Sequence, residues 1–238
     1  MTNKKVVIIT GATGGIGMGL VTAFQKQGDM VIATSRSASQ SYTVSPNLIP
    51  IDGDIAKQDT AERTVEAAVS NFGHIDVLVA AAGIYYARPF TEFSREDFDA
   101  LVSVNLFGFI YIAQLAVQQM LKQKSGSVVS ITASLADSPI AGVNASVSMI
   151  TKGGLNSVIQ SLAIEYAKEG IRFNAVAPGV VDTPLQKGLT KEYLKIRQPM
   201  GGVTVVDDIV DAVLYLVRAD QVTGEILHVD GGAHAGKW

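Results

Sequence analysis

The sequence contains no cysteine, and that absence removes several kinds of chemistry at once. Disulfide bonds, thiolate metal ligands and cysteine nucleophiles are all excluded. Histidine is nearly as scarce: only His74, His228 and His234 occur, far apart and without a ligand spacing. We therefore expect no metal site.

Strong net charge and long apolar runs are lacking as well. The formal net charge is −3 and the pI about 5.6, so the chain has no basic footprint for nucleic acid. The apolar run Val6–Ile9 is too short for a signal peptide, and no stretch approaches the roughly 18 apolar residues of a membrane span. We expect a soluble, cytoplasmic protein with no membrane or nucleic-acid partner.

The apolar pattern indicates one α/β domain. With 238 residues and 47% hydrophobic content, the chain can bury one sizeable core. The predicted strands are Val6–Thr10, Met30–Thr34, Leu48–Ile51, Val77–Ala80, Ser127–Ile131, Arg172–Val176 and Ile226–Val229. The predicted helices between them are Ile16–Gln27, Thr60–Phe72, Arg95–Lys122, Ala145–Lys168 and Val206–Arg218. Because strands alternate with helices and are apolar throughout, we predict a single-domain Rossmann-type fold over residues 1–238. Its doubly wound parallel sheet of about seven strands would carry helices on both faces.

The least regular stretch is 184–205, which holds several helix-forming residues between Pro184 and Pro199. An insertion beyond the carboxyl end of a strand suits a substrate lid in such a fold. We therefore predict a lid over 184–205, with an ordinary surface loop as the alternative.

A glycine-rich turn follows the first strand. Its residues Gly11, Thr13, Gly15, Ile16 and Gly17 form the pattern G-x-x-x-G-x-G directly before a helix. Glycines allow the backbone to approach a pyrophosphate closely, and the free N–H groups at the following helix N-terminus attract its charge. The turn therefore predicts a dinucleotide site rather than a P-loop, since the Gly-Lys-Ser/Thr of a P-loop is missing.

The end of the second strand indicates which dinucleotide binds. A carboxylate at this place would accept hydrogen bonds from the ribose 2′-hydroxyl of NAD(H), and none is present. Ser35, Arg36 and Ser37 offer donors instead, and Arg36 can hold a 2′-phosphate through its charged fork. We predict that NADP(H) is favoured over NAD(H).

Several further motifs occur in order along the chain: Ala80-Ala-Ala-Gly83, Val104-Asn105, Lys152-Gly-Gly, Asn174-Ala-Val-Ala-Pro178-Gly179 and Val229-Asp-Gly-Gly232. Together with the glycine turn, they resemble the short-chain dehydrogenase/reductase family over essentially the whole chain. The resemblance implies that Asp54 and Ile55 contact the adenine and that Ala81, Ala82 and Gly83 admit the adenosine. It further implies that Pro178, Gly179, Val181 and Thr183 hold the carboxamide side of the nicotinamide.

The same resemblance implies an active site of an oxidoreductase. Asn105 would kink a helix and anchor a proton-relay water, and Lys152 would hold the nicotinamide ribose. Ser134 matches the serine that bonds the substrate carbonyl, although the register also leaves Thr132 within reach. A serine hydrolase built on Ser134 or Ser148 is disfavoured, because neither serine lies in Gly-x-Ser-x-Gly.

One position departs from the family. The family places a tyrosine four residues before the lysine, and here that position holds Ser148. Both side chains share a helix face, but an aliphatic hydroxyl does not titrate in the accessible range. Three hypotheses remain open: proton delivery from Lys152 through water or Ser148, a substitute phenol from Tyr85, Tyr86 or Tyr193, or NADP(H) binding without turnover, as a sensor or partner subunit.

The partners expected from the sequence are a small carbonyl or alcohol substrate and further copies of the chain. Apolar residues occupy more than one face of the helices predicted at Arg95–Lys122 and Ala145–Lys168. One face must cover the sheet, so the remainder suits contact between subunits. The family commonly forms dimers or tetramers through these two helices, and we predict a homo-oligomer.

Overall fold

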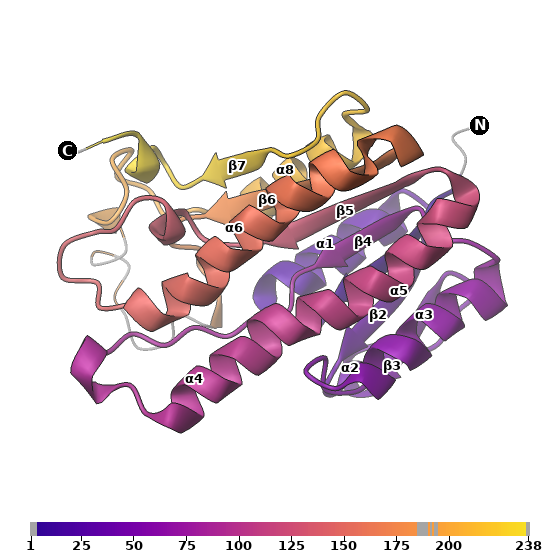
Figure 1. Cartoon of the computed structure of the whole chain (residues 1–238), viewed down its shortest axis with the longest axis horizontal. Helices are drawn as coiled ribbons and strands as arrows, with labels where there is room; N and C mark the ends of the chain where they lie inside the picture. Colours follow the sequence, from indigo (N-terminus) through magenta and orange to yellow (C-terminus); the bar gives the residue numbers. More distant parts are fainter. Residues whose placement is uncertain (1–3, 185–189, 191, 193–194, 237–238) are drawn as a thin grey trace.

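The protein folds around one parallel β-sheet. In the computed structural model, the structure describes residues 4–184, 190, 192 and 195–236. Seven strands follow the order β3-β2-β1-β4-β5-β6-β7, and every neighbouring pair is parallel (Figure 1). The strands are β1 (Val6–Thr10), β2 (Met30–Ser35), β3 (Leu48–Asp52), β4 (Val77–Ala80), β5 (Gly126–Ile131), β6 (Ile171–Pro178) and β7 (Ile226–Val229). The predicted doubly wound sheet is confirmed.

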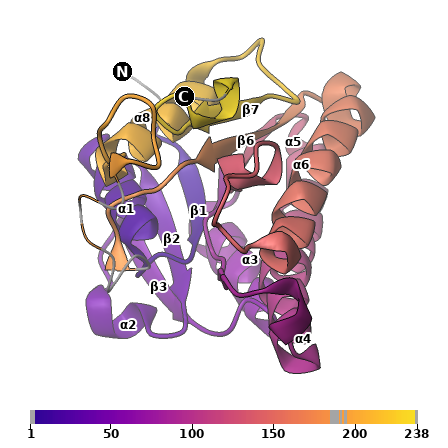
Figure 2. The ribbon, with the colours of Figure 1, turned by 90° about the vertical axis from the view of Figure 1, so that its left-hand side faces the viewer.

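Helices cover both faces of this sheet. The helices are α1 (Gly15–Lys26), α2 (Ala38–Ser41), α3 (Gln58–Phe72), α4 (Arg95–Leu101), α5 (Gly108–Gln123), α6 (Ser146–Tyr166) and α8 (Val206–Arg218). Figure 2 shows α1 and α8 on one side of the sheet and α3, α5 and α6 on the other. The four-residue helix α2 was not predicted, and the outer boundaries of the predicted elements differ from the observed ones by at most two residues.

Alternating side chains of β1 explain why its sequence is apolar over most of its length. Val6 and Ile8 belong to the buried cluster beneath α3, α5 and α6, whereas Val7 and Ile9 belong to the cluster beneath α1 and α8. Successive strand residues point to opposite faces, so a sheet covered on both sides needs no polar positions.

The helix predicted at Arg95–Lys122 is interrupted. It begins at a capping box in which the Ser94 hydroxyl accepts from the Asp97 N–H and the Asp97 carboxylate accepts from the Ser94 N–H. A π-helical turn at Val102–Phe107 then separates α4 from α5. By length and composition alone, Arg95–Gln123 would be long enough to cross a membrane, and 44% of its most apolar window is buried. No stretch was expected from the sequence to meet this test of length and composition. The apolar character has a local cause, because Ile112 and its neighbours in α5 pack on the sheet.

The topology places a crevice at the carboxyl ends of the central strands. β1 pairs with β2 on one side and with β4 on the other. The strand order therefore runs from β1 to β3 in one direction along the sheet and from β4 to β7 in the other. Doubly wound sheets bind ligands at this switch point. Part of the predicted lid, at 185–189, 191 and 193–194, lies outside the described residues, so the lid stays a prediction.

Removal of two buried methyl groups should measure the packing between α8 and the sheet. Val213 is fully buried there, whereas Val44 is 68% exposed. We expect Val213→Ala to lower the free energy of unfolding by about 2 kcal/mol, since it removes buried apolar surface and leaves a cavity. Urea denaturation at fixed protein concentration measures this change. The control Val44→Ala should stay within about 0.5 kcal/mol of the parent, and equal effects of the two variants would contradict the packing.

Candidate active site

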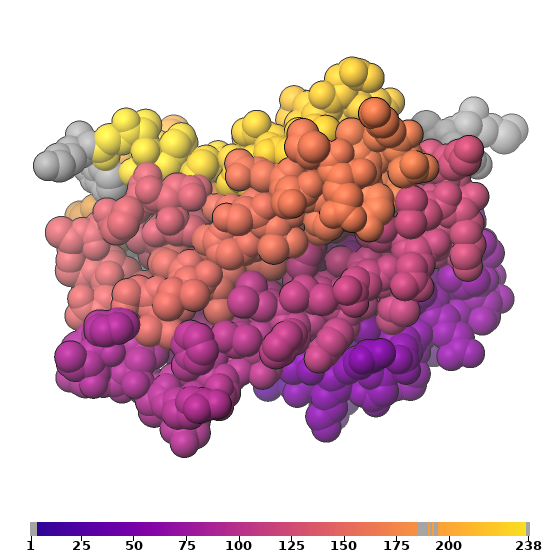
Figure 3. Space-filling view, in the orientation of Figure 1, coloured from indigo at the N-terminus to yellow at the C-terminus, as the bar shows by residue number. Residues whose placement is uncertain are grey.

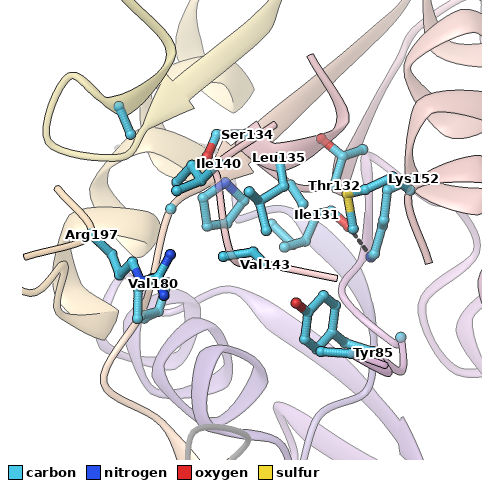
Figure 4. Close-up of a pocket in the computed structure, with 18 of the residues that line it drawn as sticks. Tyr85, Ile131, Thr132, Ser134, Leu135, Ile140, Val143, Lys152, Val180 and Arg197 are labelled. Carbon is cyan, nitrogen blue, oxygen red and sulfur yellow. Dashed lines mark hydrogen bonds between the residues drawn. The ribbon is translucent and has the colours of Figure 1, made fainter. Parts of the chain in front are cut away.

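A cavity of about 480 Å³ opens at the carboxyl edge of the sheet (Figure 4). Its wall is built from the β1–α1 turn, the segment after β4, the end of β5, one face of α6 and the segment after β6. The predicted site residues among its lining are Ile16, Ala81, Gly83, Ser134, Lys152, Pro178, Gly179, Val181 and Thr183. The predicted site residues outside the described lining are Gly11, Thr13, Gly15, Gly17, Ser35, Arg36, Ser37, Asp54, Ile55, Ala82, Asn105 and Ser148.

The glycine turn packs too closely to admit side chains. Gly11 has φ +66°, and a Cβ on it would lie 2.7 Å from the backbone of Ala82. A Cβ on Gly17 would collide with the carbonyl oxygen of Gly11, and one on Gly15 would lie 2.7 Å from the Thr183 side chain. The helix that follows, α1, has no side-chain cap and no acidic residue in its first turn. Its N-terminal N–H groups therefore suit an anionic ligand.

The residues expected around the adenosine lie at the ends of β2 and β3. Arg36 is exposed just beyond β2, and the Asp54 carboxylate accepts a 3.0 Å bond from the Ala56 N–H. Asp52, which the sequence argument did not consider, pairs in register with Ser35. Hydrogen bonds from the Ser39 hydroxyl and N–H lower the pKa of the Asp52 carboxyl. These bonds tie the segment that carries Arg36 to the end of β3.

Lys152 extends from α6 into the cavity wall. Its Nζ donates a 2.8 Å hydrogen bond to the carbonyl oxygen of Ile131, drawn as a dashed line in Figure 4. A Cβ on Gly83 would lie only 3.0 Å from this Nζ, so the glycine leaves room for the ammonium group. Burial disfavours the charged form and lowers the pKa of Lys152 to about 8. At neutral pH the group thus still carries its proton, but it releases that proton more readily than an ordinary lysine.

Ser148 lies one helical turn before Lys152, but its hydroxyl is engaged elsewhere. The side chain is completely buried. Its Oγ accepts a 2.9 Å bond from the Tyr86 N–H and donates a 2.8 Å bond to the Tyr86 carbonyl oxygen. Of the two side chains expected to face the cofactor together, only Lys152 is among the described residues lining the cavity.

Asn105 lies in the π-helical turn and is also buried. Its Oδ1 accepts from the Ile84 N–H at 2.9 Å, and its Nδ2 donates to the Ile84 carbonyl oxygen at 3.0 Å. The same Nδ2 donates to Thr151 Oγ1 at 2.9 Å. A π-helical turn therefore interrupts the helix at this residue, and the Asn105 amide holds the segment after β4.

Two hydroxyl residues beyond β5 remain alternatives for contact with a substrate oxygen. Thr132 and Ser134 are both buried and both line the cavity. Thr132 Oγ1 donates a long bond of 3.4 Å to the Val176 carbonyl oxygen, and Ser134 begins a short 3₁₀ turn. Among the tyrosines, Tyr85 lines the cavity, whereas the Tyr86 ring lies under the Arg88 guanidinium. Tyr193 lies outside the described residues.

Comparison with known proteins gives the family. The model of a family described as enoyl-(acyl carrier protein) reductase matches residues 11–234. The chain belongs to the short-chain dehydrogenase/reductase family. It is 34% identical to L-rhamnose-1-dehydrogenase of Scheffersomyces stipitis, a match that covers 98% of this chain and 96% of the relative.

Solved structures agree with this family assignment. The structure of ElxO with NADP bound superposes with a TM-score of 0.92 at 27% identity, covering 98% of this chain and all of the other. The 3-ketoacyl-(acyl-carrier-protein) reductase of Brucella melitensis complexed with NADH gives a TM-score of 0.90 at 31% identity, covering 97% and 98% of the two chains.

One charged group of this short-chain dehydrogenase/reductase was missed from the sequence. Arg197 lines the cavity, and its Nη1 donates a 3.1 Å bond to the Ala141 carbonyl oxygen. It lies in the irregular 184–205 stretch, where no periodicity indicates the direction of a side chain. By contrast, Arg88 also lines the cavity but is ion-paired to Asp97 at 2.7 Å.

Loss of the Ser148 hydroxyl should destabilise the fold. Ser148→Ala leaves the part-buried Tyr86 N–H and carbonyl without this partner, and we expect the free energy of unfolding to fall by about 1–3 kcal/mol. Ser157→Ala, an exposed serine on the same helix, is the matched control and should change it by less than about 0.5 kcal/mol. Chemical denaturation of both variants makes the comparison. Indistinguishable stabilities would mean that the Ser148 bonds with Tyr86 do not stabilise the fold.

Proposed function

We propose that this protein is an NADP(H)-dependent oxidoreductase that moves a hydride between the nicotinamide and a carbonyl or alcohol substrate, with a proton donor other than the family's tyrosine. One observation carries the proposal: the Lys152 ammonium lines the same cavity as Gly83 and the Pro178–Thr183 segment. Its oxidoreductase relatives support the general reaction class. The altered proton donor rests on Ser148, which stands four residues before Lys152.

The residues present fit a nicotinamide dinucleotide. The glycine turn has no space for side chains, and the uncapped start of α1 suits a pyrophosphate. Lys152 would hold ribose hydroxyls, and the backbone from Pro178 to Thr183 would bind the carboxamide. When bound, this group supplies or accepts the hydride.

The preference for NADP(H) rests on Arg36. Its exposed guanidinium follows β2 directly, where a charged fork suits a 2′-phosphate. Relatives of similar fold have been solved with NADP and with NADH, so membership of the family does not by itself decide between the two cofactors.

Lys152 is the proton donor that the geometry supports best. With a pKa lowered to about 8, its ammonium is a better acid than an ordinary lysine and remains protonated at neutral pH. In reduction, the carbonyl carbon gains the hydride, the π pair of the carbonyl moves to its oxygen, and Nζ supplies the proton directly or through one water. Ser148 is a poor relay, because both of its hydrogen bonds are made with the Tyr86 backbone.

A second candidate function is NADP(H) binding without turnover, as a sensor or as a partner subunit. The observation that favours it is the burial of Ser148, which leaves the tyrosine position without a group that reaches the cavity. NADPH oxidation with a panel of activated ketones and quinones separates the two candidates. Turnover by the parent protein supports the reductase. Cofactor binding without turnover, unaltered in Lys152→Ala, would favour the sensor.

The substrate and the quaternary structure are also part of the proposal. Apart from Arg88, Lys152 and Arg197, the cavity lining is mostly apolar, which suits an apolar carbonyl compound. The helices α5 and α6 form the outer layer facing the viewer in Figure 3. In α6, Ile150 is 54% and Ile164 81% exposed, and Phe107 in the turn before α5 is 44% exposed, so these helices suit contact with a second copy. Light scattering that shows a monomer at micromolar concentration would contradict this homo-oligomer.

The rate of reduction should depend on the protonation of Lys152. We expect kcat with NADPH to be highest below the lysine pKa of about 8 and to fall as the pH rises through it, because the acid loses its proton. Steady-state kinetics across this range measure the profile. Lys152→Met should remove this fall and reduce kcat by about 100-fold or more. A profile that is flat through the same range in the parent would contradict proton donation by Lys152.

Arg36 should control the choice between cofactors. We expect Arg36→Ala to weaken NADPH binding by about 10–100-fold, since an ionic hydrogen bond contributes roughly 1.5–3 kcal/mol, and to leave NADH binding almost unchanged. Fluorescence titration with both cofactors measures the affinities. Arg63→Ala removes an exposed arginine of α3 that bonds the Asp52 carbonyl oxygen, and it serves as a control for general charge loss. Tighter binding of NADH than of NADPH by the parent would end the NADP(H) proposal.

A further inference from the structure

The segment after β4 is held by side chains that replace a neighbouring strand. Asn105 bonds both the N–H and the carbonyl of Ile84, at 2.9 and 3.0 Å. Ser148 bonds both the N–H and the carbonyl of Tyr86, at 2.9 and 2.8 Å. Paired bonds at residues i and i+2 are the pattern made along one edge of an extended chain. Two helices therefore hold Ile84–Tyr86 as a strand would.

The two anchors form one buried unit. Asn105 is 2% exposed, whereas Ser148 and Thr151 are completely buried. Thr151 Oγ1 accepts from Asn105 Nδ2 at 2.9 Å and donates to the Ser148 carbonyl oxygen at 2.8 Å. Because water does not reach these groups, a lost bond leaves a buried polar atom without a partner. The position of the segment is thus strongly specified.

The residue between the two anchored positions is Tyr85. Among the described residues Tyr86 does not line the cavity, whereas Ile84 and Tyr85 do. Figure 4 shows the Tyr85 phenol oxygen directed into the cavity that Lys152 also lines. The Tyr86 ring instead packs under the Arg88 guanidinium, with 5.6 Å between the ring centroid and the guanidinium carbon.

We propose that Tyr85 donates a hydrogen bond to the substrate oxygen and that Ser148, through the Tyr86 backbone, is its positioning residue. The serine at the position of the family's tyrosine would thus hold a different tyrosine in the site. This inference rests on the proposed function. As the carbonyl carbon gains the hydride, the π pair moves to the oxygen, the Tyr85 hydroxyl stabilises the growing negative charge, and Lys152 supplies the proton that completes the alcohol.

The test compares three single variants with NADPH and trifluoroacetophenone or phenanthrenequinone as the carbonyl compound. We expect Tyr85→Phe to lower kcat about 100-fold, as removal of one donor to a developing oxyanion does in other enzymes. Its NADPH affinity, measured by fluorescence, should stay within about twofold of the parent, since a donor to the substrate oxygen acts on the reaction and not on cofactor binding. The matched control Tyr86→Phe should retain the kcat of the parent. Ser148→Ala should lower kcat about 10-fold, because a misplaced group loses much of its effect.

A double variant separates positioning from general destabilisation. In the Tyr85→Phe background, Ser148→Ala should change kcat by less than about twofold, because no hydroxyl remains to be positioned. An equal loss in both backgrounds would overturn the role of Ser148. If the parent turns over and Tyr85→Phe is as fast, the role of Tyr85 fails while the proposed function stands. If the parent oxidises no NADPH with any carbonyl compound, the proposed function fails and the inference with it.

Discussion

A hydroxyl can donate one hydrogen bond, and the buried Ser148 hydroxyl donates its bond to the Tyr86 carbonyl oxygen. It also accepts a bond from the N–H of the same residue. This constraint determines much of the candidate active site. It fixes the wall segment after β4, it keeps Ser148 out of the cavity, and it leaves Lys152 as the ionisable group of α6 among the described lining residues.

The environment of Lys152 follows from the same arrangement. Its ammonium lies between the Ile131 carbonyl oxygen and the space left by Gly83, in a wall that is otherwise mostly apolar. Burial in this wall disfavours the charged form, so the pKa of Lys152 falls to about 8. A lysine in this state can keep its proton while the substrate binds and release it during reduction.

The sequence predicts the fold well because its signals there are local and repeated. Apolar strands such as Val6–Thr10 need cover on both faces, and Gly11 at positive φ has a direct physical reason to be glycine. The direction of Ser148 was not predictable in the same way. Helix spacing places it on the face of Lys152, but a serine is too short to follow the lysine into the cavity. It therefore bonds the nearest backbone, and which backbone is nearest depends on the tertiary path of residues 84–86.

Two other features were beyond sequence reasoning for related reasons. The π-helical turn at Val102–Phe107 contains Asn105, which makes a tertiary contact with Ile84 that no helical periodicity reveals. Arg197 reaches the cavity from a stretch without regular spacing.

The central claim is that Ser148 positions the wall of the site and does not donate a proton. A crystal structure with NADP and a bound ketone tests it most directly. The account predicts that the Tyr85 hydroxyl, the Lys152 ammonium or a water bonded to one of them lies ~3 Å from the ketone oxygen. Ser148 should still be bonded to the Tyr86 backbone. A Ser148 hydroxyl turned away from Tyr86 and lying ~3 Å from the ketone oxygen would contradict it.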